Sequence, residues 1–246
     1  MNINISKTAA GMAQQAAACA AEAINRTIAE RGEARILLAT GESQLASIKC
    51  LTQMDVEWDK VTMFHLDEYI DLPESHKASF RKYLKERFID VVKPRQAYLV
   101  NGEGDVKANI EALTEELRKA PIDVALVGIG ENAHIAFNDP PADFNTDQAY
   151  IIVNLDQKCK QQQVNEGWFE TLEDVPKEAI SMTVPQILKS RTIVTIVPGI
   201  RKADAVYKTL SSEEVTNLVP ASILKTHADW NLFLDGESAS KIIPQL

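Results

Sequence analysis

The chain has 246 residues, of which 45% are hydrophobic and 25% are charged, and its formal net charge is -9. This length and composition fit one sizeable globular domain with a well-filled core, so we expect a single domain over residues 1–246. The acidic balance argues against a nucleic-acid partner, which would need a basic face. A small anionic substrate is still compatible, because a pocket can be locally positive.

The cysteines and the N-terminus indicate the compartment. Cys19, Cys50 and Cys159 are widely spaced without a CxxC pair, which is typical of a reduced protein without disulfides or structural zinc. The first residues lack the basic start and apolar core of a signal peptide. No run approaches the roughly 18 apolar residues of a membrane span. We expect a soluble, cytoplasmic protein with no membrane partner; the sequence leaves open whether it forms a homo-oligomer.

Apolar runs alternate with longer amphipathic segments along the whole chain. The first predicted helix runs from Thr8 to Arg31 and ends at Gly32. In chain order there follow a strand at 34–40, a helix at 42–53, and a strand that begins at 60 and runs into an acidic loop by 69. A helix at 75–88 comes next, with an apolar stripe of Phe80, Tyr83, Leu84 and Phe88. Next come a strand at 97–101, a helix at 105–119, strands at 122–130 and 149–154, a helical segment from 156, a strand at 191–199, a helix at 201–210, and a strand at 231–235.

Alternation of this kind predicts an α/β fold, a doubly wound and mostly parallel sheet with helices on both faces, similar to a Rossmann fold. In such sheets ligands bind outside the carboxyl ends of the strands. The candidate functional loops are therefore those that join a strand to a helix: Thr40–Ser43, Asp67–Asp71, Gly130–Asp139 and Gly199–Lys202.

Two of these loops could hold a phosphate group. In ATGES, Gly41 permits close backbone approach, and Thr40 and Ser43 offer hydroxyls beside a helix start. Glu42 would repel a phosphate, although a glutamate in a first helical turn suits the helix dipole. The alternative is a simple turn with Thr40 or Ser43 as the N-cap.

The second such loop is GIRKAD, which begins at Gly199. Arg201 and Lys202 start a helix there, where two cations oppose the dipole. They are tolerated on a solvated surface but are better explained by a bound anion. We take Lys202 as the preferred phosphate ligand.

The HLDEY segment places Asp67 and Glu68 at the end of a strand. Because side chains alternate along a strand, only one of these carboxylates can face a shared pocket. A carboxylate beside a sugar carbon can move a proton between neighbouring carbons, the central step of an aldose–ketose isomerisation. The alternative is a helix cap or a solvated turn.

The stretch GENAHIAFNDPP carries the remaining candidates. His134 could protonate and deprotonate a sugar ring oxygen near neutral pH. Asp139 could orient the imidazole of His134 and stabilise the charged form of that ring. Against this, a single histidine in a loop is more often a structural hydrogen-bonding residue.

Together the four loops resemble the glucosamine-6-phosphate deaminase (isomerase) family, within a larger group that includes 6-phosphogluconolactonases. ATGES resembles the phosphate loop of the family, HLDEYIDLPESHKASFRKYL its acidic segment, LVGIGENAHIAFNDP its histidine loop, and VPGIRKADAV its lysine helix start. IAFNDPP and DEY are closer to deaminases than to lactonases, in which TASLFPG and DER are typical.

The resemblance implies a role for each candidate residue. Asp67 corresponds to the base that moves a proton between C1 and C2, and His134 to the acid and base of ring opening. Lys202 and the Thr40–Ser43 loop correspond to phosphate ligands, and Gly130 and Ala133 to substrate contacts. Asp139 and Asn132 complete the catalytic loop. The family reaction releases ammonia from C2 and needs no metal or organic cofactor.

Four departures from the family pattern concern the substrate. Asn132 replaces an aspartate, Ala133 a glycine, and Asp139 a glutamate. The segment 150–176 corresponds to a mobile lid with a phosphate-binding arginine, which is lacking here; Lys158 or Lys160 could replace it, although a lysine lacks the arginine fork. Galactosamine 6-phosphate is thus an alternative substrate to glucosamine 6-phosphate. The sequence is also compatible with a lactonase and with a non-catalytic sugar-phosphate sensor.

Overall fold

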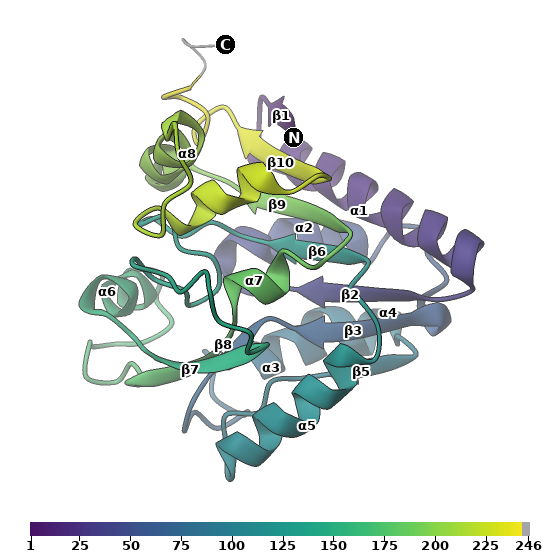
Figure 1. Ribbon diagram of the computed structural model, residues 1–246, viewed down its shortest axis with the longest axis horizontal. Coiled ribbons are helices and arrows are strands. Elements are labelled where there is room, and N and C mark those ends of the chain that lie inside the picture. The colour runs from purple at the N-terminus through teal and green to yellow at the C-terminus, as the bar shows by residue number, and fades with distance from the viewer. Residues whose placement is uncertain (243–246) are drawn as a thin grey trace.

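Parallel strands form the seven-stranded central sheet of the computed structural model (Figure 1), which describes residues 1–242 apart from the side chain of Lys158. In spatial order the strands are β1 (Asn2–Ser6), β10 (Trp230–Asp235), β9 (Thr192–Val197), β6 (Val124–Val127), β2 (Ala34–Leu38), β3 (Val61–His65) and β5 (Gln96–Tyr98). Every residue of β2, β6, β9 and β10 is buried. Continuous burial is expected for parallel strands covered on both faces.

Helices cover both faces of this sheet, as the sequence predicts. One face carries α1 (Ala9–Arg31), α2 (Leu45–Leu51) and the run of α3 (Phe80–Leu84), a π-helical turn (Lys85–Ile89) and α4 (Asp90–Val92). The other carries α5 (Val106–Arg118), α7 (Val184–Ile187), α8 (Ala203–Ser211) and a 3₁₀ helix (Pro220–Thr226). The doubly wound α/β fold is thereby confirmed.

The ends of α1 show how the sequence sets a helix boundary. The Thr8 hydroxyl accepts a hydrogen bond from the Gly11 N–H at 3.1 Å. At the other end Gly32 adopts a φ of 81° and donates its N–H to the Ile28 carbonyl at 2.8 Å. A polar N-cap and a left-handed glycine C-cap satisfy backbone groups that the helix itself leaves free.

A second sheet of three antiparallel strands lies beside the central one. It comprises β4 (Asp67–Tyr69), β8 (Glu178–Met182) and β7 (Tyr150–Asn154). The strand expected from Lys60 ends at His65, and Asp67–Tyr69, expected in an acidic loop, form a strand of the second sheet. Leu66 is the junction: its N–H donates to Leu38 of the central sheet at 3.1 Å, and its carbonyl accepts from Met182 at 2.9 Å. Asp67 is thus the first residue beyond the parallel sheet.

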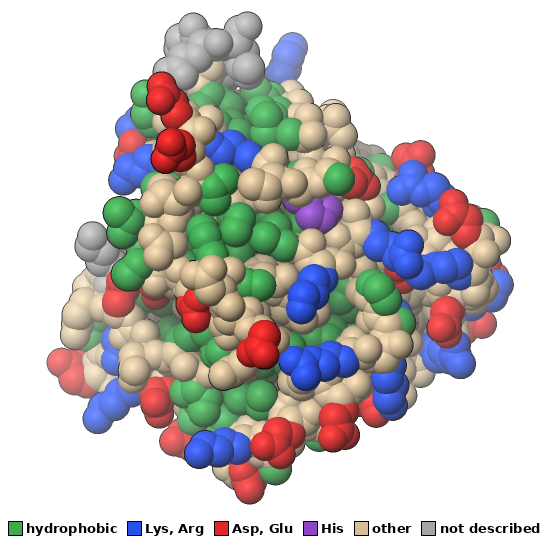
Figure 2. Space-filling model, viewed as in Figure 1, with side chains coloured by type: hydrophobic (Ala, Val, Ile, Leu, Met, Phe, Trp, Pro, Cys, Tyr) green, Lys and Arg blue, Asp and Glu red, His purple; other side chains and the backbone are tan. Residues whose placement is uncertain are grey.

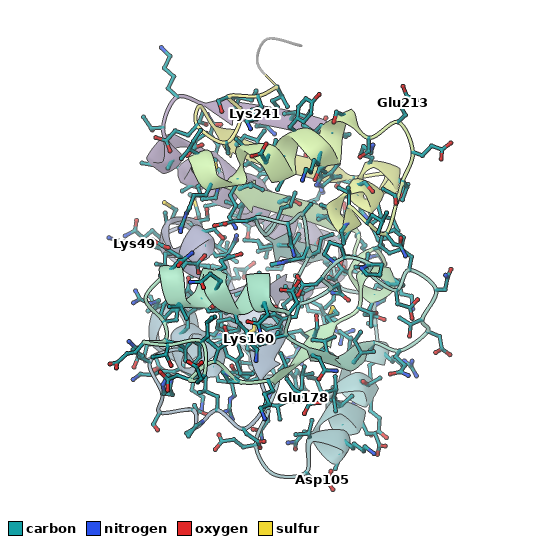
Figure 3. All side chains as sticks on the ribbon, turned by 90° about the vertical axis from the view of Figure 1, so that its left-hand side faces the viewer. Lys49, Asp105, Lys160, Glu178, Glu213 and Lys241 are labelled. Atoms are coloured by element: carbon teal, nitrogen blue, oxygen red, sulfur yellow. The ribbon has the colours of Figure 1, made fainter. Side chains whose placement is uncertain are left out.

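The segment after β7 folds over the edge of the second sheet. It contains α6 (Gln157–Asn165), which crosses the front of the molecule in Figure 3. An apolar cluster holds this segment in place, with Leu155, Cys159, Phe169 and Val175 packing with Tyr69, Phe80 and Phe137. The cluster fixes α6 close to the end of β3.

Charged side chains of both signs share the face shown in Figure 2 with exposed hydrophobic side chains near its centre. Among the described residues, no helix is long and apolar enough to cross a membrane.

Candidate active site

The four candidate loops converge because the strands that precede them are neighbours. The order β9-β6-β2-β3 places four carboxyl ends side by side along one edge of the sheet, the edge where α/β proteins bind ligands. A cavity lies there. Eight of the residues that the sequence singles out line it: Thr40, Gly41, Glu42, Ser43, Asp67, Gly130, His134 and Lys202.

Lys202 gives one end of the cavity an anion-binding character. Its side chain is only 7% exposed, and among the described residues its ammonium group has no hydrogen bond or ion pair. Burial lowers the pKa of Lys202, and the charge of Glu166 partly offsets this effect. Because a buried, unpaired cation is costly, this position favours an anionic ligand.

The Thr40–Ser43 loop lies beside Lys202. Gly41 has a φ of 104°, a conformation that side chains disfavour. The Thr40 hydroxyl is buried without a hydrogen-bond partner among the described residues. The Ser43 hydroxyl accepts a hydrogen bond from the Gln44 amide at 3.1 Å. The 3₁₀ turn Glu42–Gln44 has no side-chain cap, so neither hydroxyl serves as an N-cap, and the loop keeps its donors for a ligand.

Arg201 and Glu42 lie at the rim rather than inside the anion site. The Arg201 guanidinium is 3.5 Å from the Glu42 carboxylate and 3.6 Å from that of Glu131. These three side chains are between 36% and 56% exposed. Because Arg201 is exposed and lies near two carboxylates, Lys202 is the buried cation of the Gly199–Lys202 loop.

Asp67 and Glu68 point to different surroundings, as strand alternation predicts. Asp67 is buried and lines the cavity, and no side-chain hydrogen bond holds its carboxyl group among the described residues. Burial, followed by the charge of Glu68, raises the pKa of Asp67 to about 8. A carboxyl group with this pKa can both accept and return a proton near neutral pH.

Glu68 has a structural role. Its carboxylate accepts hydrogen bonds from the Phe80 and Arg81 N–H groups at 3.2 and 2.8 Å. The Ser79 hydroxyl donates at 3.0 Å and the Arg81 Nε at 3.2 Å. These donors fix the start of α3 at Phe80, five residues later than the sequence suggests. The predicted apolar stripe of this helix is buried as expected.

His134 forms a pair with Asp139. The distance from His134 Nδ1 to Asp139 Oδ1 is 2.9 Å, which favours the tautomer with the proton on Nδ1. The Asn132 amide donates to the same carboxylate oxygen at 2.8 Å, and its oxygen accepts the His134 N–H at 3.1 Å. Burial alone would raise the pKa of Asp139, but the contacts with His134 and Asn132 outweigh it and lower this pKa. Nε2 remains available as a proton acceptor.

Asn132 and Asp139 therefore hold His134 in place through its backbone N–H and its Nδ1 atom. Neither side chain lines the cavity. The Asn132 amide donates a hydrogen bond to Asp139 and carries no charge. A positioning role for both residues fits this geometry better than direct contact with a substrate.

The backbone of the histidine loop makes room for the imidazole. A Cβ atom on Gly130 would lie 2.1 Å from His134 Nε2, so only glycine allows this ring position. Ala133 has a φ of 67° and is fully buried in the core. It does not line the cavity, so the predicted substrate contact by its side chain is not supported.

Helix α6 contributes residues that the sequence did not indicate. Gln162, Gln163 and Glu166 line the cavity from this helix, opposite the four loops. Lys160 does not line it, and Figure 3 shows this residue beside the edge of α6. The prediction that Lys160 binds phosphate is thus not supported by its position. The side chain of Lys158 lies outside the described structure.

Apolar residues complete the cavity wall. They include Leu66, Phe80, Ala136 and Phe137.

No cluster of three or more His, Cys, Asp or Glu side chains that could hold a metal ion occurs in the described part of the chain.

Comparison with known proteins identifies the family. Residues 7–232 match the family model of glucosamine-6-phosphate isomerases/6-phosphogluconolactonase. A glucosamine-6-phosphate deaminase of Streptococcus suis (strain 05ZYH33) is 37% identical over 207 residues, covering 84% of this chain and 86% of that protein. The structure of a monomeric glucosamine-6-phosphate deaminase superposes with a TM-score of 0.89 at 28% identity, covering 98% of this chain and all of that one.

A 6-phosphogluconolactonase of Shewanella baltica has the same fold, with a TM-score of 0.79, 18% identity, and coverage of 96% and 97% of the two chains. The family match spans all four loops of the cavity. The chain belongs to the family of glucosamine-6-phosphate isomerases and 6-phosphogluconolactonases.

Proposed function

We propose that the protein is an amino-sugar-phosphate deaminase. It converts glucosamine 6-phosphate, or its 4-epimer galactosamine 6-phosphate, and water to a ketose 6-phosphate and ammonia. The observation that carries this proposal is one cavity with a buried, unpaired ammonium at one end and both Asp67 and His134 among its other lining residues. The named deaminase relatives support the same reaction.

The phosphate group of the substrate occupies the end of the cavity beside Lys202. The ammonium group, the Thr40 and Ser43 hydroxyls and the loop around Gly41 supply positive charge and donors there. Binding compensates the burial of Lys202, since hydrogen bonds between ionised groups are about twice as strong as neutral ones. The sugar is thereby held with its reacting carbons toward Asp67 and His134.

His134 opens the sugar ring. Nε2 of the neutral imidazole removes the proton of the C1 hydroxyl and returns it to the ring oxygen as the C1–O5 bond breaks. Asp139, paired with Nδ1 at 2.9 Å, stabilises the imidazolium that forms between these two transfers. The product is the open-chain aldehyde.

Asp67 then transfers a proton from C2 to C1. Removal of the C2 proton gives an enol-like intermediate, and Asp67 returns this proton to C1. A proton of the amino group passes to the C1 oxygen, which gives a C1 alcohol and a neutral imine at C2. Water adds to this imine, and ammonia leaves from C2 to give the ketose. With a pKa of about 8, Asp67 has a proton affinity that suits both the removal and the return of the proton.

The segment around α6 acts as a lid in this reaction. It covers the cavity with Gln162, Gln163 and Glu166 and is attached through the apolar cluster that includes Cys159. Exclusion of water from the cavity would protect the enol-like intermediate. The chain functions as one domain that includes this lid.

An assay of both products tests the proposal. The protein is incubated with glucosamine 6-phosphate and, separately, with galactosamine 6-phosphate, and ammonia and ketose phosphate are quantified. We expect equal amounts of the two products from at least one substrate. Release of neither product would contradict the proposal, and hydrolysis of 6-phosphogluconolactone instead would identify a lactonase. Tight binding of the sugar phosphates without any turnover would identify a sensor.

A further inference from the structure

Glu166 is a carboxylate of the lid segment that the proposed chemistry does not use. It is half-buried and lines the cavity. The same side chain also borders a surface groove beside the cavity. Four residues border both the cavity and the groove, namely Glu42, Ser43, Glu166 and Lys202. We call the boundary that these four residues form the groove mouth; it lies at the anion end of the cavity, because Lys202 belongs to it.

Two hydrogen bonds hold Glu166 at the end of α6. Its backbone N–H donates to the Gln162 carbonyl at 2.9 Å. The side-chain amide of Gln162 donates to the Glu166 carboxylate at 2.8 Å. Because Gln162 also lines the cavity, this pair keeps the carboxylate at the groove mouth.

The C-terminal end of α6 adds negative potential at the same place. Glu166 is the C-cap of this nine-residue helix, and the C-terminus of a helix carries a partial negative charge. A cation would be favourable at this position, whereas a carboxylate opposes the helix dipole. The lid therefore brings a full negative charge and a dipole end of the same sign to the groove mouth.

The charges around Lys202 identify Glu166 as its main counter-charge. Burial lowers the pKa of Lys202, and Glu166 is the neighbouring charge that raises it most. Weaker effects come from Glu131 and Glu42, which raise this pKa, and from Arg201, which lowers it. Glu131 and Glu42 lie 3.6 and 3.5 Å from the Arg201 guanidinium, whereas Glu166 forms no ion pair among the described residues. The charge of Glu166 is thus free to act on Lys202 and on an anion bound beside it.

We propose that Glu166 is an electrostatic gate at the groove mouth: its carboxylate repels an entering phosphate group and so lowers the affinity of the cavity for anions. This inference rests on the proposed anion site at Lys202. In the empty cavity the opposite charges of Glu166 and Lys202 reduce the cost of the buried ammonium. A phosphate group takes over this role, and the carboxylate then lies beside a group with about two negative charges. The gate therefore favours release of the phosphorylated product.

Binding of inorganic phosphate tests the gate without any reaction. The variants Glu166→Gln and Glu166→Ala remove the charge, and the glutamine can still accept the hydrogen bond from the Gln162 amide. Glu173→Gln is the matched control, since Glu173 belongs to the same segment, is exposed and does not line the cavity. Kd is measured by calorimetry at about pH 8, where phosphate is mainly a dianion, at low salt and at about 0.5 M NaCl.

Both Glu166 variants should bind phosphate more tightly than the wild-type protein. We expect Kd to fall by about threefold to thirtyfold, because a unit charge several ångströms from a dianion is removed. The gain should shrink at high salt, which screens the charge, and Glu173→Gln should leave Kd unchanged. A Kd for Glu166→Gln that equals or exceeds the wild-type value, an equal gain in the control, or no phosphate binding by any of these proteins would overturn the proposal.

Failure of the deaminase proposal gives a different result. If the wild-type protein releases no ammonia from either amino sugar but Glu166→Gln still tightens phosphate binding, the gate stands and the reaction is wrong. If ammonia is released but Glu166→Gln does not tighten phosphate binding, the reaction stands and the gate is wrong.

Discussion

Replacement of Asp67 by asparagine should abolish catalysis and stabilise the folded protein at the same time. The asparagine is nearly isosteric but can neither accept a proton from C2 nor carry a charge. In the wild-type protein, burial and the neighbouring Glu68 raise the pKa of Asp67 from 3.8 to about 8. The protonated form therefore stabilises the fold fully below pH 4, and this contribution is lost as the pH rises through 8.

The size of the effect follows from the pKa. Between pH 6 and pH 9, Asp67 titrates across about two pH units, each of which changes the free energy of unfolding by about 1.4 kcal/mol. The titration of Asp67 thus lowers the free energy of unfolding of the wild-type protein by about 3 kcal/mol between pH 6 and pH 9. The Asp67→Asn variant keeps this free energy because its residue 67 does not titrate. For a chain of this size, 1 kcal/mol shifts Tm by about 2–4 °C, so the variant should gain about 8 °C on the wild type across this range. Both pH values lie above the sequence pI of 5.0, which limits precipitation.

Thermal unfolding and turnover of the two proteins are measured side by side at pH 6 and pH 9. All other groups titrate in both proteins, so the difference in Tm isolates Asp67. A difference in Tm that does not change with pH would refute the raised pKa. Turnover by the variant within tenfold of wild type would refute the role of Asp67 as the base.

Further predictions concern other parts of the cavity. Lys202→Met should raise the Kd for inorganic phosphate and the KM for substrate by about 10- to 100-fold, the effect of one charge-assisted contact; unchanged phosphate binding by calorimetry would place the anion elsewhere. Gly130→Ala should lower kcat by about 100-fold, because the new Cβ would lie 2.1 Å from His134 Nε2 and must displace the imidazole; a crystal structure with the ring unmoved would contradict this. Asp139→Asn should lower kcat by about 10²- to 10⁴-fold with little change in KM, whereas a change in KM alone would indicate a binding role.

The functional edge of the fold could be predicted from the sequence because it depends on a general property of parallel sheets. Once the buried strands were recognised, their carboxyl ends had to share one edge. This reasoning placed Asp67, His134 and Lys202 together without knowledge of the strand order. The contact between His134 and Asp139 was also predictable, since both lie in one short loop.

The parts that depend on long-range contacts could not be read from the sequence. The segment 60–69 reads as a strand that runs into an acidic loop. That Asp67–Tyr69 instead form a strand of a second sheet depends on pairing with β8, more than 100 residues later. The short strand β1, with alternating and partly exposed residues, was missed for a similar reason. Its place at the sheet edge depends on β10 at the other end of the chain.

The face of α6 that lines the cavity is the main feature of the site that the sequence does not reveal. The segment QKCKQQQVN is polar on all sides, so no apolar stripe indicates which residues face inward. The choice of Lys160 as a ligand rests on its charge and on the resemblance of its segment to the family lid. The orientation of α6, in contrast, depends on the packing of Cys159 in an apolar cluster with residues distant in sequence. Gln162, Gln163 and Glu166 are found at the cavity only because the structure shows which face of α6 is turned toward it.

The most direct test of the central claim is the stoichiometry of ammonia and ketose phosphate released from glucosamine 6-phosphate and galactosamine 6-phosphate. The wild-type protein should release the two products in a 1:1 ratio, as the balanced reaction requires, and Asp67→Asn should release neither. Absence of ammonia from both amino sugars, with a folded protein that still binds inorganic phosphate at Lys202, would contradict the proposed function.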